Sequence, residues 1–290
     1  MNGKAAAKQE GPLALICGGG SLPLAVADYV GKRGRKVALF PLYGAANPAD
    51  FTNRPHQWIY VGQAGRFVRL AKAAGCRDVV LIGALVRPAF WQLRLDLQTI
   101  MLLPRLARAF RGGDNHLLSA VGGLFETYGF RMLGAHEVAP EILVPEGKLG
   151  HIQPSERDQA DIALGLDYLR AAGPFDVGQS VVVANKHVLA VEAAEGTDAM
   201  LKRVTEMRAS GRVRTPTGTG VLVKAPKKGQ DLRFDMPSIG PKTVEGAALA
   251  GLAGIAVAAG ATIIAEPERL VEAADRANIF VTGESAGTTR

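Results

Sequence analysis

Cysteine is scarce in this sequence, which has two, Cys17 and Cys76, among 290 residues. Two thiols cannot form the disulfide framework of a small secreted protein, and they are too few for a four-cysteine zinc site. Both fall within predicted secondary-structure elements, so we expect buried free thiols and a reducing compartment. No two of the five histidines have the i, i+4 spacing of a zinc-hydrolase helix. The sequence therefore argues against a disulfide-stapled protein and against a zinc hydrolase of that type.

Long apolar runs are absent as well. The one stretch that resembles a membrane span is the uncharged segment from Gly246 to Ala265. Four glycines interrupt it and alanine dominates it, so we predict a buried helix followed by two short strands. The first ten residues lack the apolar core of a secretory signal, and we predict a loose tail over residues 1–12. Neither segment predicts a membrane span or secretion.

The overall composition is that of an ordinary folded protein. Apolar residues make up 48% of the chain and charged residues 21%, and the length suits two domains. Lysine and arginine exceed the acids by seven, and the isoelectric point is about 9.5. Such an excess suits nucleic acid, an anionic membrane face or a phosphorylated substrate, and it does not choose among them.

The N-terminal part alternates short apolar runs with helical spacing. Leu13 to Cys17 is a continuous apolar run, which is typical of a parallel strand covered on both faces. We predict strands at 13–17, 36–41, 78–82 and 130–133, and helices at 22–33, 66–74, 97–111 and 115–128. This βαβ pattern predicts a Rossmann-like parallel-sheet domain over residues 13–138.

A second α/β domain is predicted over residues 155–290. It follows a segment, 139–154, that has three prolines, two glycines and no clear period, and that we interpret as a linker. Ser155 is expected to cap the first helix, which runs to about Ala172. We predict further strands at 180–184, 188–191, 221–223, 254–257, 262–265 and 279–281, and helices at 198–209, 242–252 and 267–277.

A glycine run follows the first predicted strand. Glycines let backbone N–H groups approach a phosphate at a helix N-terminus, so Gly18, Gly19, Gly20 and Ser21 are candidate phosphate or nucleotide ligands. A redox dinucleotide fits poorly, because Pro23 stands where the fingerprint has its third glycine, and no carboxylate follows the second strand before residue 50. A tight structural turn is the alternative interpretation.

Arg87 follows the third predicted strand, within the run from Gly83 to Pro88. The carboxyl ends of parallel strands share one edge of the sheet, so Arg87 and the glycine run should lie on the same edge. We interpret Arg87 as a candidate ligand for a phosphate or nucleotide, with a surface arginine stiffened by proline as the alternative.

Three polar runs in the last third of the chain lie between apolar segments. The first contains Glu195, Thr197 and Asp198; Thr197 can cap the next helix or help to bind an anion there. Lys224 and Lys227 leave a strand through a proline turn, where they can reach a phosphate or remain solvated. Asp235 precedes a Gly-Pro helix start. Its carboxylate is a candidate for binding Mg²⁺ or orienting water, or for capping that helix.

Six runs in a fixed order give the chain a family resemblance. They are Gly18-Gly-Gly-Ser-Leu-Pro23, Gly83 to Pro88, Gly134-Ala-His-Glu137, Val191 to Met200, Lys224-Ala-Pro-Lys227 and Asp235-Met-Pro-Ser-Ile-Gly240. The chain resembles the LpxI-type UDP-2,3-diacylglucosamine pyrophosphatases of lipid A biosynthesis. The resemblance extends from about Leu13 to Thr282, and the combination of runs is far more specific than any single one.

This resemblance implies an activity, a cofactor and a site. Members of the family hydrolyse the pyrophosphate of UDP-2,3-diacylglucosamine to UMP and 2,3-diacylglucosamine 1-phosphate, with water attacking the α-phosphorus, and they depend on a divalent metal, usually Mg²⁺. The family's key aspartate falls on Asp235, and Asp198 and Thr197 lie in another family motif. We therefore assign Asp235, Asp198 and Lys224 to catalysis, and Asp235 and Asp198 to the metal.

The remaining assignments concern binding and location. The substrate ligands expected from the motifs are Gly18, Gly19, Gly20, Ser21, Arg87, Glu195, Thr197 and Lys227. The expected partner is a UDP-linked lipid and not nucleic acid. We expect the protein to be a homodimer in the cytoplasm, with peripheral contact to the inner membrane. Two alternatives remain open: a nucleotide-sugar or lipid-binding protein without catalysis, and a dinucleotide-dependent oxidoreductase.

Overall fold

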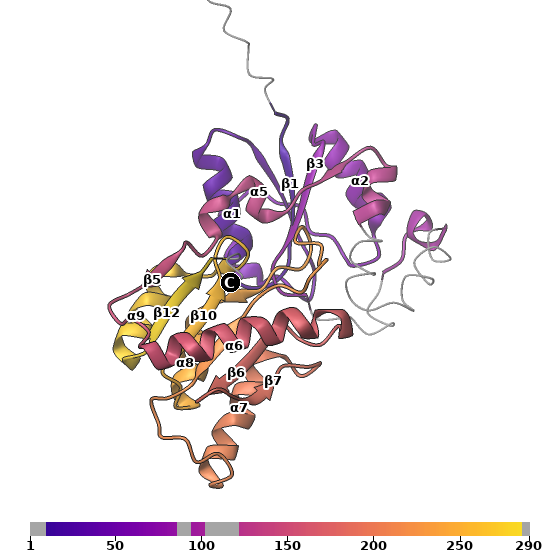
Figure 1. Ribbon diagram of the computed structural model, residues 1–290. Helices are drawn as coiled ribbons and strands as arrows, with labels where there is room; N and C mark the ends of the chain where they lie inside the picture. Colours follow the sequence, from indigo (N-terminus) through magenta and orange to yellow (C-terminus); the bar gives the residue numbers. More distant parts are fainter. Residues whose placement is uncertain (1–9, 86–93, 102–121, 286–290) are drawn as a thin grey trace, which may run out of the picture. The chain divides into compact units, whose positions relative to one another are not determined.

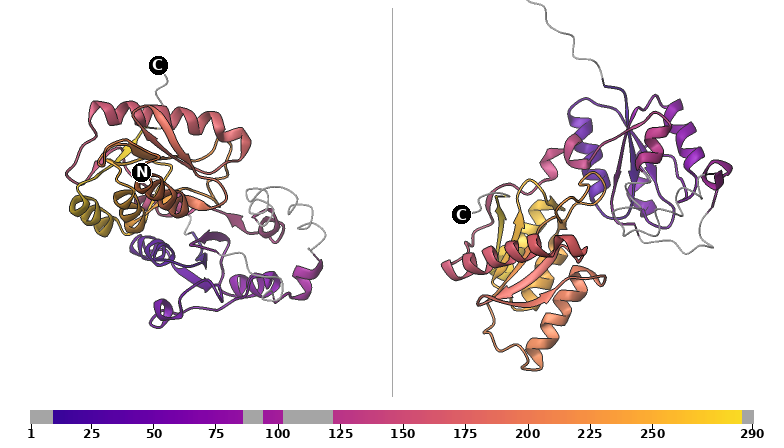
Figure 2. Two further views of the ribbon diagram at one scale, coloured as in Figure 1. Left: turned by 90° about the horizontal axis from the view of Figure 1, so that it is seen from below. Right: turned by 45° about the vertical axis from the view of Figure 1, so that its right-hand side comes forward.

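The computed structural model describes residues 10–85, 94–101 and 122–285. The chain divides into two compact units, Met1–Glu141 and Ile142–Arg290, each with its own β-sheet (Figures 1 and 2). Both units are α/β, which confirms the predicted fold class.

The first unit is built on a parallel sheet with the strand order β2-β1-β3-β4. Every residue of the central strand β1 is buried, because neighbouring strands flank it and the sheet is covered on both faces. The strands are β1 (Leu13–Cys17), β2 (Val37–Pro41), β3 (Asp78–Ile82) and β4 (Arg131–Met132). The helical segments are α1 (Leu22–Lys32), η1 (Pro48–Phe51), α2 (Ala64–Ala73) and α5 (Ala135–Val138), together with short helical stretches at 97–101 and 122–127, and η3 (Pro140–Ile142) spans the boundary between the units.

The second unit contains a six-stranded mixed sheet with the order β5-β12-β10-β8-β6-β7. Strands β8, β10 and β12 are parallel to one another. Strand β5 pairs antiparallel with β12, and β6 pairs antiparallel with both β8 and β7. The strands are β5 (Gly147–Leu149), β6 (Ser180–Ala184), β7 (His187–Val191), β8 (Val221–Lys224), β10 (Gly254–Ala258) and β12 (Phe280–Glu284). The helices are α6 (Glu156–Ala172), η4 (Gly173–Phe175), α7 (Gly196–Ala209), α8 (Pro241–Leu249) and α9 (Pro267–Ala277), and a small parallel pair joins β9 (Ser238–Ile239) to β11 (Ile263–Ile264).

Helices cover both faces of the second sheet. Helix α6 crosses one face, and α7, α8 and α9 lie on the other (Figures 1 and 2). Successive residues of β6 supply both cores, since Val181 and Val183 pack toward α6 while Val182 packs toward the opposite helices. This is why the strand is a continuous valine run and not an alternating one.

Several predictions about local structure are confirmed. Cys17 and Cys76 are both free and buried, and burial raises the pKa of the Cys17 thiol to about 12. Ser155 caps α6, in a capping box with Asp158. The uncharged segment 246–265 forms the end of α8 followed by β10 and β11, as predicted. Within the described ranges, no helix has the length and apolar character needed to cross a membrane.

The segment 139–154, interpreted above as a linker, contains regular structure. Its strand β5 pairs with β12, with Leu149 opposite Val281. Its Val144 is fully buried in the core of the second unit. The limits 13–138 and 155–290 stay a prediction, but residues 142–154 pack as part of the second unit. The predicted helices at 97–111 and 115–128 extend outside the described residues, and the parts inside, 97–101 and 122–127, are helical.

A buried aspartate at the start of β3 leads to a prediction about acid stability. Asp78 accepts hydrogen bonds from Arg131, at 2.8 and 3.0 Å, and from Arg35. Burial alone would raise the pKa of Asp78, but the two arginines outweigh it and the net pKa is lowered. A lowered carboxyl pKa contributes stability above the unfolded value of about 3.9, and this stability is lost as the pH falls through the folded value.

We therefore expect Asp78→Asn to lower the unfolding free energy of the first unit by roughly 3 kcal/mol near neutral pH. The difference from the unsubstituted protein should begin to shrink below about pH 4, where the carboxyl is protonated in the unfolded state, and should vanish only below the lowered folded pKa. Denaturant unfolding at several pH values measures both effects. The control is Asp28→Asn, which removes an exposed pair with Arg54 and should cost less than about 1 kcal/mol. An equal loss in both variants would contradict the prediction.

Candidate functional site

The polar residues of the second unit meet at one edge of its sheet. Lys224 ends β8, and Ser180 begins the antiparallel neighbour β6, so the two residues lie side by side at this edge. Strand β7 also ends here, and the chain then passes through Glu192 into α7. The carboxyl ends of the parallel strands β8 and β10 share the same edge, which is the usual place for a ligand in α/β proteins.

A chain of hydrogen bonds links three of these residues. Lys224 Nζ donates to Thr197 Oγ1 at 2.8 Å, and Thr197 Oγ1 donates to Glu192 Oε1 at 3.0 Å. Ser180 Oγ lies 3.3 Å from the same threonine hydroxyl. The Thr197 proton is thus directed to Glu192, and its lone pairs face Lys224 and Ser180.

The ammonium group of Lys224 is buried among acids. Its residue is 9% exposed, and burial lowers the pKa of Lys224, while the negative charges of Glu192, Asp198 and Asp235 act in the opposite direction. Of its three N–H donors, one binds Thr197, and the others have no acceptor within the described part of the chain. A buried ammonium with open donors is suited to an anionic group such as a phosphate.

Asp235 is held by two glutamine amides. Gln230 Nε2 donates to Asp235 Oδ2 at 2.5 Å, and Gln179 Nε2 donates to the same oxygen at 3.1 Å. The other carboxylate oxygen, Oδ1, accepts no hydrogen bond from the described residues. The carboxylate is half-buried, in the turn between β8 and β9.

The helix-cap alternatives for Thr197 and Asp235 are wrong. Helix α7 begins at Gly196, with Glu195 as its N-cap residue, so Thr197 lies inside the first turn and directs its hydroxyl to Glu192 and Lys224. Helix α8 has Gly240 as its N-cap residue, five positions beyond Asp235. Neither side chain is occupied by capping.

Three further predicted site residues surround this cluster. Asp198 is exposed in the first turn of α7. Glu195 pairs with Arg203 at 2.7 Å and also accepts from the N–H of Ala193, so it fixes the turn before α7. Lys227 pairs with Asp176 at 2.5 Å. The structure therefore places both Glu195 and Lys227 in ion pairs near the cluster, and their assignment to substrate stays a prediction.

None of Glu192, Gln179 and Gln230 is among the site residues assigned from the sequence, although all three contact assigned residues. Glu192 directly follows a predicted strand, as Lys224 does, and this position alone could have indicated a functional residue. Gly178 supports its placement, because a Cβ at Gly178 would lie 2.5 Å from both Glu192 Cγ and Glu192 O. The glutamines have no such signal, since neutral amides are common in turns and their contacts depend on the folded register.

The fit to a divalent cation rests on two carboxylates. In the described ranges, no three side chains of His, Cys, Asp or Glu are close enough together to hold a metal ion. Asp235 Oδ1 and the exposed Asp198 carboxylate are hard oxygen donors of the type that Mg²⁺ prefers. Mg²⁺ often takes only one or two protein carboxylates and completes its shell with water and substrate phosphates. Asp235 and Asp198 are thus of the donor type that Mg²⁺ takes, and an ion at this edge would need water and substrate phosphates as its other ligands.

The glycine run in the first unit forms a close backbone crossing. The N–H of Gly18 donates to Ile82 O and the N–H of Gly19 to Ala84 O, each at 2.8 Å. A Cβ at Gly18 would come within 2.6 Å of Ala84 O, so no larger residue fits. These two N–H groups are therefore already bound to backbone oxygens at the end of β3 and just after it. A phosphate at this turn would have to use N–H or hydroxyl groups from Gly20 and Ser21 onward. Arg87 lies outside the described residues.

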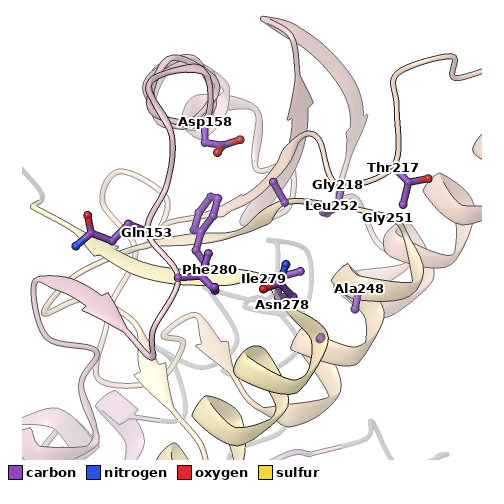
Figure 3. Close-up of a pocket in the computed structure, with 13 residues that line it drawn as sticks. Gln153, Asp158, Thr217, Gly218, Ala248, Gly251, Leu252, Asn278, Ile279 and Phe280 are labelled. Carbon is purple, nitrogen blue, oxygen red and sulfur yellow. The ribbon is translucent and has the colours of Figure 1, made fainter.

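A cavity of about 410 Å³ lies at the opposite edge of the second sheet. Its walls come from the amino ends of β10 and β12, the turn before β8 and the start of α6, and include Leu252, Phe280 and Thr217 (Figure 3). Its buried carboxylate, Asp158, already accepts from Ser155 in the helix cap. The cavity is therefore separate from the Lys224 and Asp235 cluster.

Comparison with known proteins identifies the family. Residues 12–142 match the LpxI N-terminal domain, and residues 145–282 match the LpxI C-terminal domain. The chain belongs to the LpxI family. The two matches meet close to the boundary between the compact units. The cluster around Lys224 and Asp235 therefore lies in the LpxI C-terminal domain.

A curated LpxI protein covers nearly the whole chain. The relative is named UDP-2,3-diacylglucosamine pyrophosphatase LpxI, from Caulobacter vibrioides, and is 42% identical over 271 residues, or 93% of this chain and 96% of the relative. Among solved structures, a short-chain dehydrogenase/reductase superfamily protein from Agrobacterium tumefaciens, with bound NAD, covers 94% of this chain and 85% of its own. It is 14% identical with a TM-score of 0.27, too low to support an argument.

Proposed function

We propose that this protein hydrolyses the pyrophosphate bond of UDP-2,3-diacylglucosamine, releasing UMP and 2,3-diacylglucosamine 1-phosphate. Water attacks the α-phosphorus, and the bond from that phosphorus to the bridging oxygen breaks. The bridging oxygen leaves with the lipid phosphate. Membership of the LpxI family and the activity named for the relative from Caulobacter vibrioides support the reaction.

The observation that carries the proposal is the convergence of one open carboxylate and one buried ammonium at the same sheet edge. Asp235 offers Oδ1, and Lys224 offers N–H donors that no described residue accepts. Attack at a pyrophosphate requires neutralisation of phosphoryl charge and orientation of a water molecule. The Lys224 ammonium can neutralise phosphoryl charge, and the Asp235 carboxylate can orient the water molecule.

Each residue has a defined part in this proposal. Lys224 binds a phosphoryl oxygen and offsets the charge that develops on it. Thr197 and Glu192 hold the lysine ammonium in place through their hydrogen bonds. Asp235 orients the attacking water and accepts its proton at Oδ1.

We also propose Mg²⁺, or another divalent cation, held by Asp235 and Asp198 jointly with the substrate phosphates. When bound, such an ion supplies positive charge to the phosphate oxygens and favours deprotonation of water. Gly20, Ser21 and Arg87, together with Thr197, Glu195 and Lys227, stay proposed substrate ligands, whereas Gly18 and Gly19 shape the turn and have their N–H groups bound to backbone oxygens. We also propose a homodimer and a cytoplasmic location. Peripheral contact with the inner membrane belongs to the same proposal, because the proposed substrate is a lipid.

Turnover of UDP-2,3-diacylglucosamine by the purified protein tests the proposal. We expect equimolar UMP and lipid phosphate with Mg²⁺, and loss of both products in EDTA with recovery on adding Mg²⁺ back. Binding of the nucleotide lipid without product would support a binding protein without catalysis. Stabilisation by NAD(H), measured as a rise in melting temperature, in place of stabilisation by UDP or UMP would support an oxidoreductase.

A further inference from the structure

Gln230 contacts Asp235 at two points. Its side-chain amide nitrogen donates to the carboxylate oxygen Oδ2 at 2.5 Å and to the backbone oxygen of Asp235 at 2.8 Å. The glutamine is 9% exposed, so its amide must find partners within the protein. One buried side chain thus fixes both the backbone and the carboxylate of Asp235.

The orientation of the Gln230 amide is determined by a third contact. The backbone N–H of Lys227 donates to Gln230 Oε1 at 2.8 Å. A backbone N–H can only donate, so the amide oxygen must face Lys227 and the amide NH₂ must face Asp235. The chain therefore presents Asp235 with a donor at this position.

Gln179, the residue directly before β6, approaches the same carboxylate oxygen. Its backbone N–H donates to Glu192 Oε2 at 3.1 Å, and its backbone oxygen accepts from Ala225 at 3.0 Å, which extends the pairing of β6 with β8. Its side chain then reaches Asp235 Oδ2 at 3.1 Å. A residue anchored in the sheet thus connects Asp235 with Glu192.

Both donors on Asp235 are neutral. Asp231, four residues earlier, shows the alternative, because it pairs with the guanidinium of Arg233 at 2.8 Å. An arginine would fix a carboxylate but would also offset its charge, whereas an amide fixes it and leaves the charge in place. Both amides bind Oδ2, so Oδ1 is the carboxylate oxygen to which no described group donates a hydrogen bond.

We propose that Gln230 and Gln179 are positioning residues, which clamp Asp235 through Oδ2 and so aim Oδ1 at the attacking water or at the metal. This amide clamp rests on the proposed function. It acts on Asp235 alone and touches no substrate. Its removal should therefore change the chemical step and not substrate binding.

Gln230→Glu tests the clamp, because it keeps the shape and the acceptor for Lys227 while replacing the donor with a second carboxyl. Two carboxyl groups in contact resist double ionisation and share a proton. We expect kcat to fall by about 100-fold at alkaline pH, with KM within about threefold, because Asp235 is displaced.

Two further variants separate loss of the clamp from the general effect of an added negative charge. Gln159→Glu adds the same charge on the exposed surface of α6 and should leave kcat and its pH profile unchanged. Gln179→Met removes one donor without adding charge and should lower kcat by about tenfold at every pH, with KM preserved. Unchanged kcat in both clamp variants, or a raised KM with normal kcat, would overturn the proposal.

A spectroscopic readout tests the clamp without turnover. In ¹H–¹⁵N spectra, the side-chain amide protons of Gln230 and Gln179 should lie downfield and move on Asp235→Asn substitution. If the unsubstituted protein hydrolyses no substrate but these signals move, the proposed function fails and the clamp stands. If the signals do not move, the clamp is overturned whatever the activity.

Discussion

Asp235→Asn should reduce kcat for UDP-2,3-diacylglucosamine by about 1,000-fold or more, while substrate affinity and the unfolding temperature stay close to those of the unsubstituted protein. The substitution keeps the side-chain volume but removes the negative charge. Asparagine can neither accept the proton of the attacking water nor hold a divalent cation as a carboxylate does. The loss should therefore appear in the chemical step.

The matched control is Asp167→Asn, which removes an exposed carboxylate paired with Arg170 on α6. It should leave kcat and KM unchanged. Single-turnover kinetics and calorimetric binding of Mg²⁺ should be compared for both variants, because the metal titration reports on Asp235 without any turnover. Turnover of the Asp235 variant within about tenfold of normal, at saturating Mg²⁺, would refute the assignment of Asp235.

Lys224→Met should reduce kcat/KM by about 100-fold or more. Methionine matches the lysine side chain as far as Cε but supplies no N–H donor and no charge. The acids Glu192, Asp198 and Asp235 would then face the substrate phosphates without the cation that stands among them. Repulsion of the anionic substrate and loss of charge neutralisation would both lower kcat/KM.

The pH profile gives an independent test of Lys224. Burial lowers the pKa of Lys224, so its ammonium should lose its proton below the ordinary lysine value of about 10.4. We expect kcat/KM to decline on the alkaline side at a pH below that value. Lys202→Met, on the exposed side of α7, is the control and should retain full activity. Equal activity of the two lysine variants would exclude Lys224 from the site.

Much of the fold can be predicted from local sequence because its strands are apolar runs with clear ends. Ser180–Ala184 and Leu13–Cys17 lie where predicted, since central strands buried on both faces require continuous apolar side chains. Strand β5 was not predicted. Its three residues, Gly-Lys-Leu, have no strand pattern, and they become a strand only by pairing with β12.

The candidate site was predictable only in part. Lys224 was indicated by its place at the end of an apolar run, and Asp198 and Asp235 by their places near predicted helix starts and by the family resemblance. The partners of these residues depend on long-range register. Gln179 reaches Asp235, 56 positions away, only because Ser180 pairs with Lys224 across two antiparallel strands. No local pattern in the sequence reports such a contact.

Turnover of UDP-2,3-diacylglucosamine in ¹⁸O-labelled water, with mass analysis of both products, tests the central claim most directly. The proposed attack at the α-phosphorus predicts one labelled oxygen in UMP and none in 2,3-diacylglucosamine 1-phosphate, with Mg²⁺ present and not in EDTA. Label in the lipid phosphate would contradict the proposed direction of attack. Absence of UMP release would contradict the proposed hydrolysis itself.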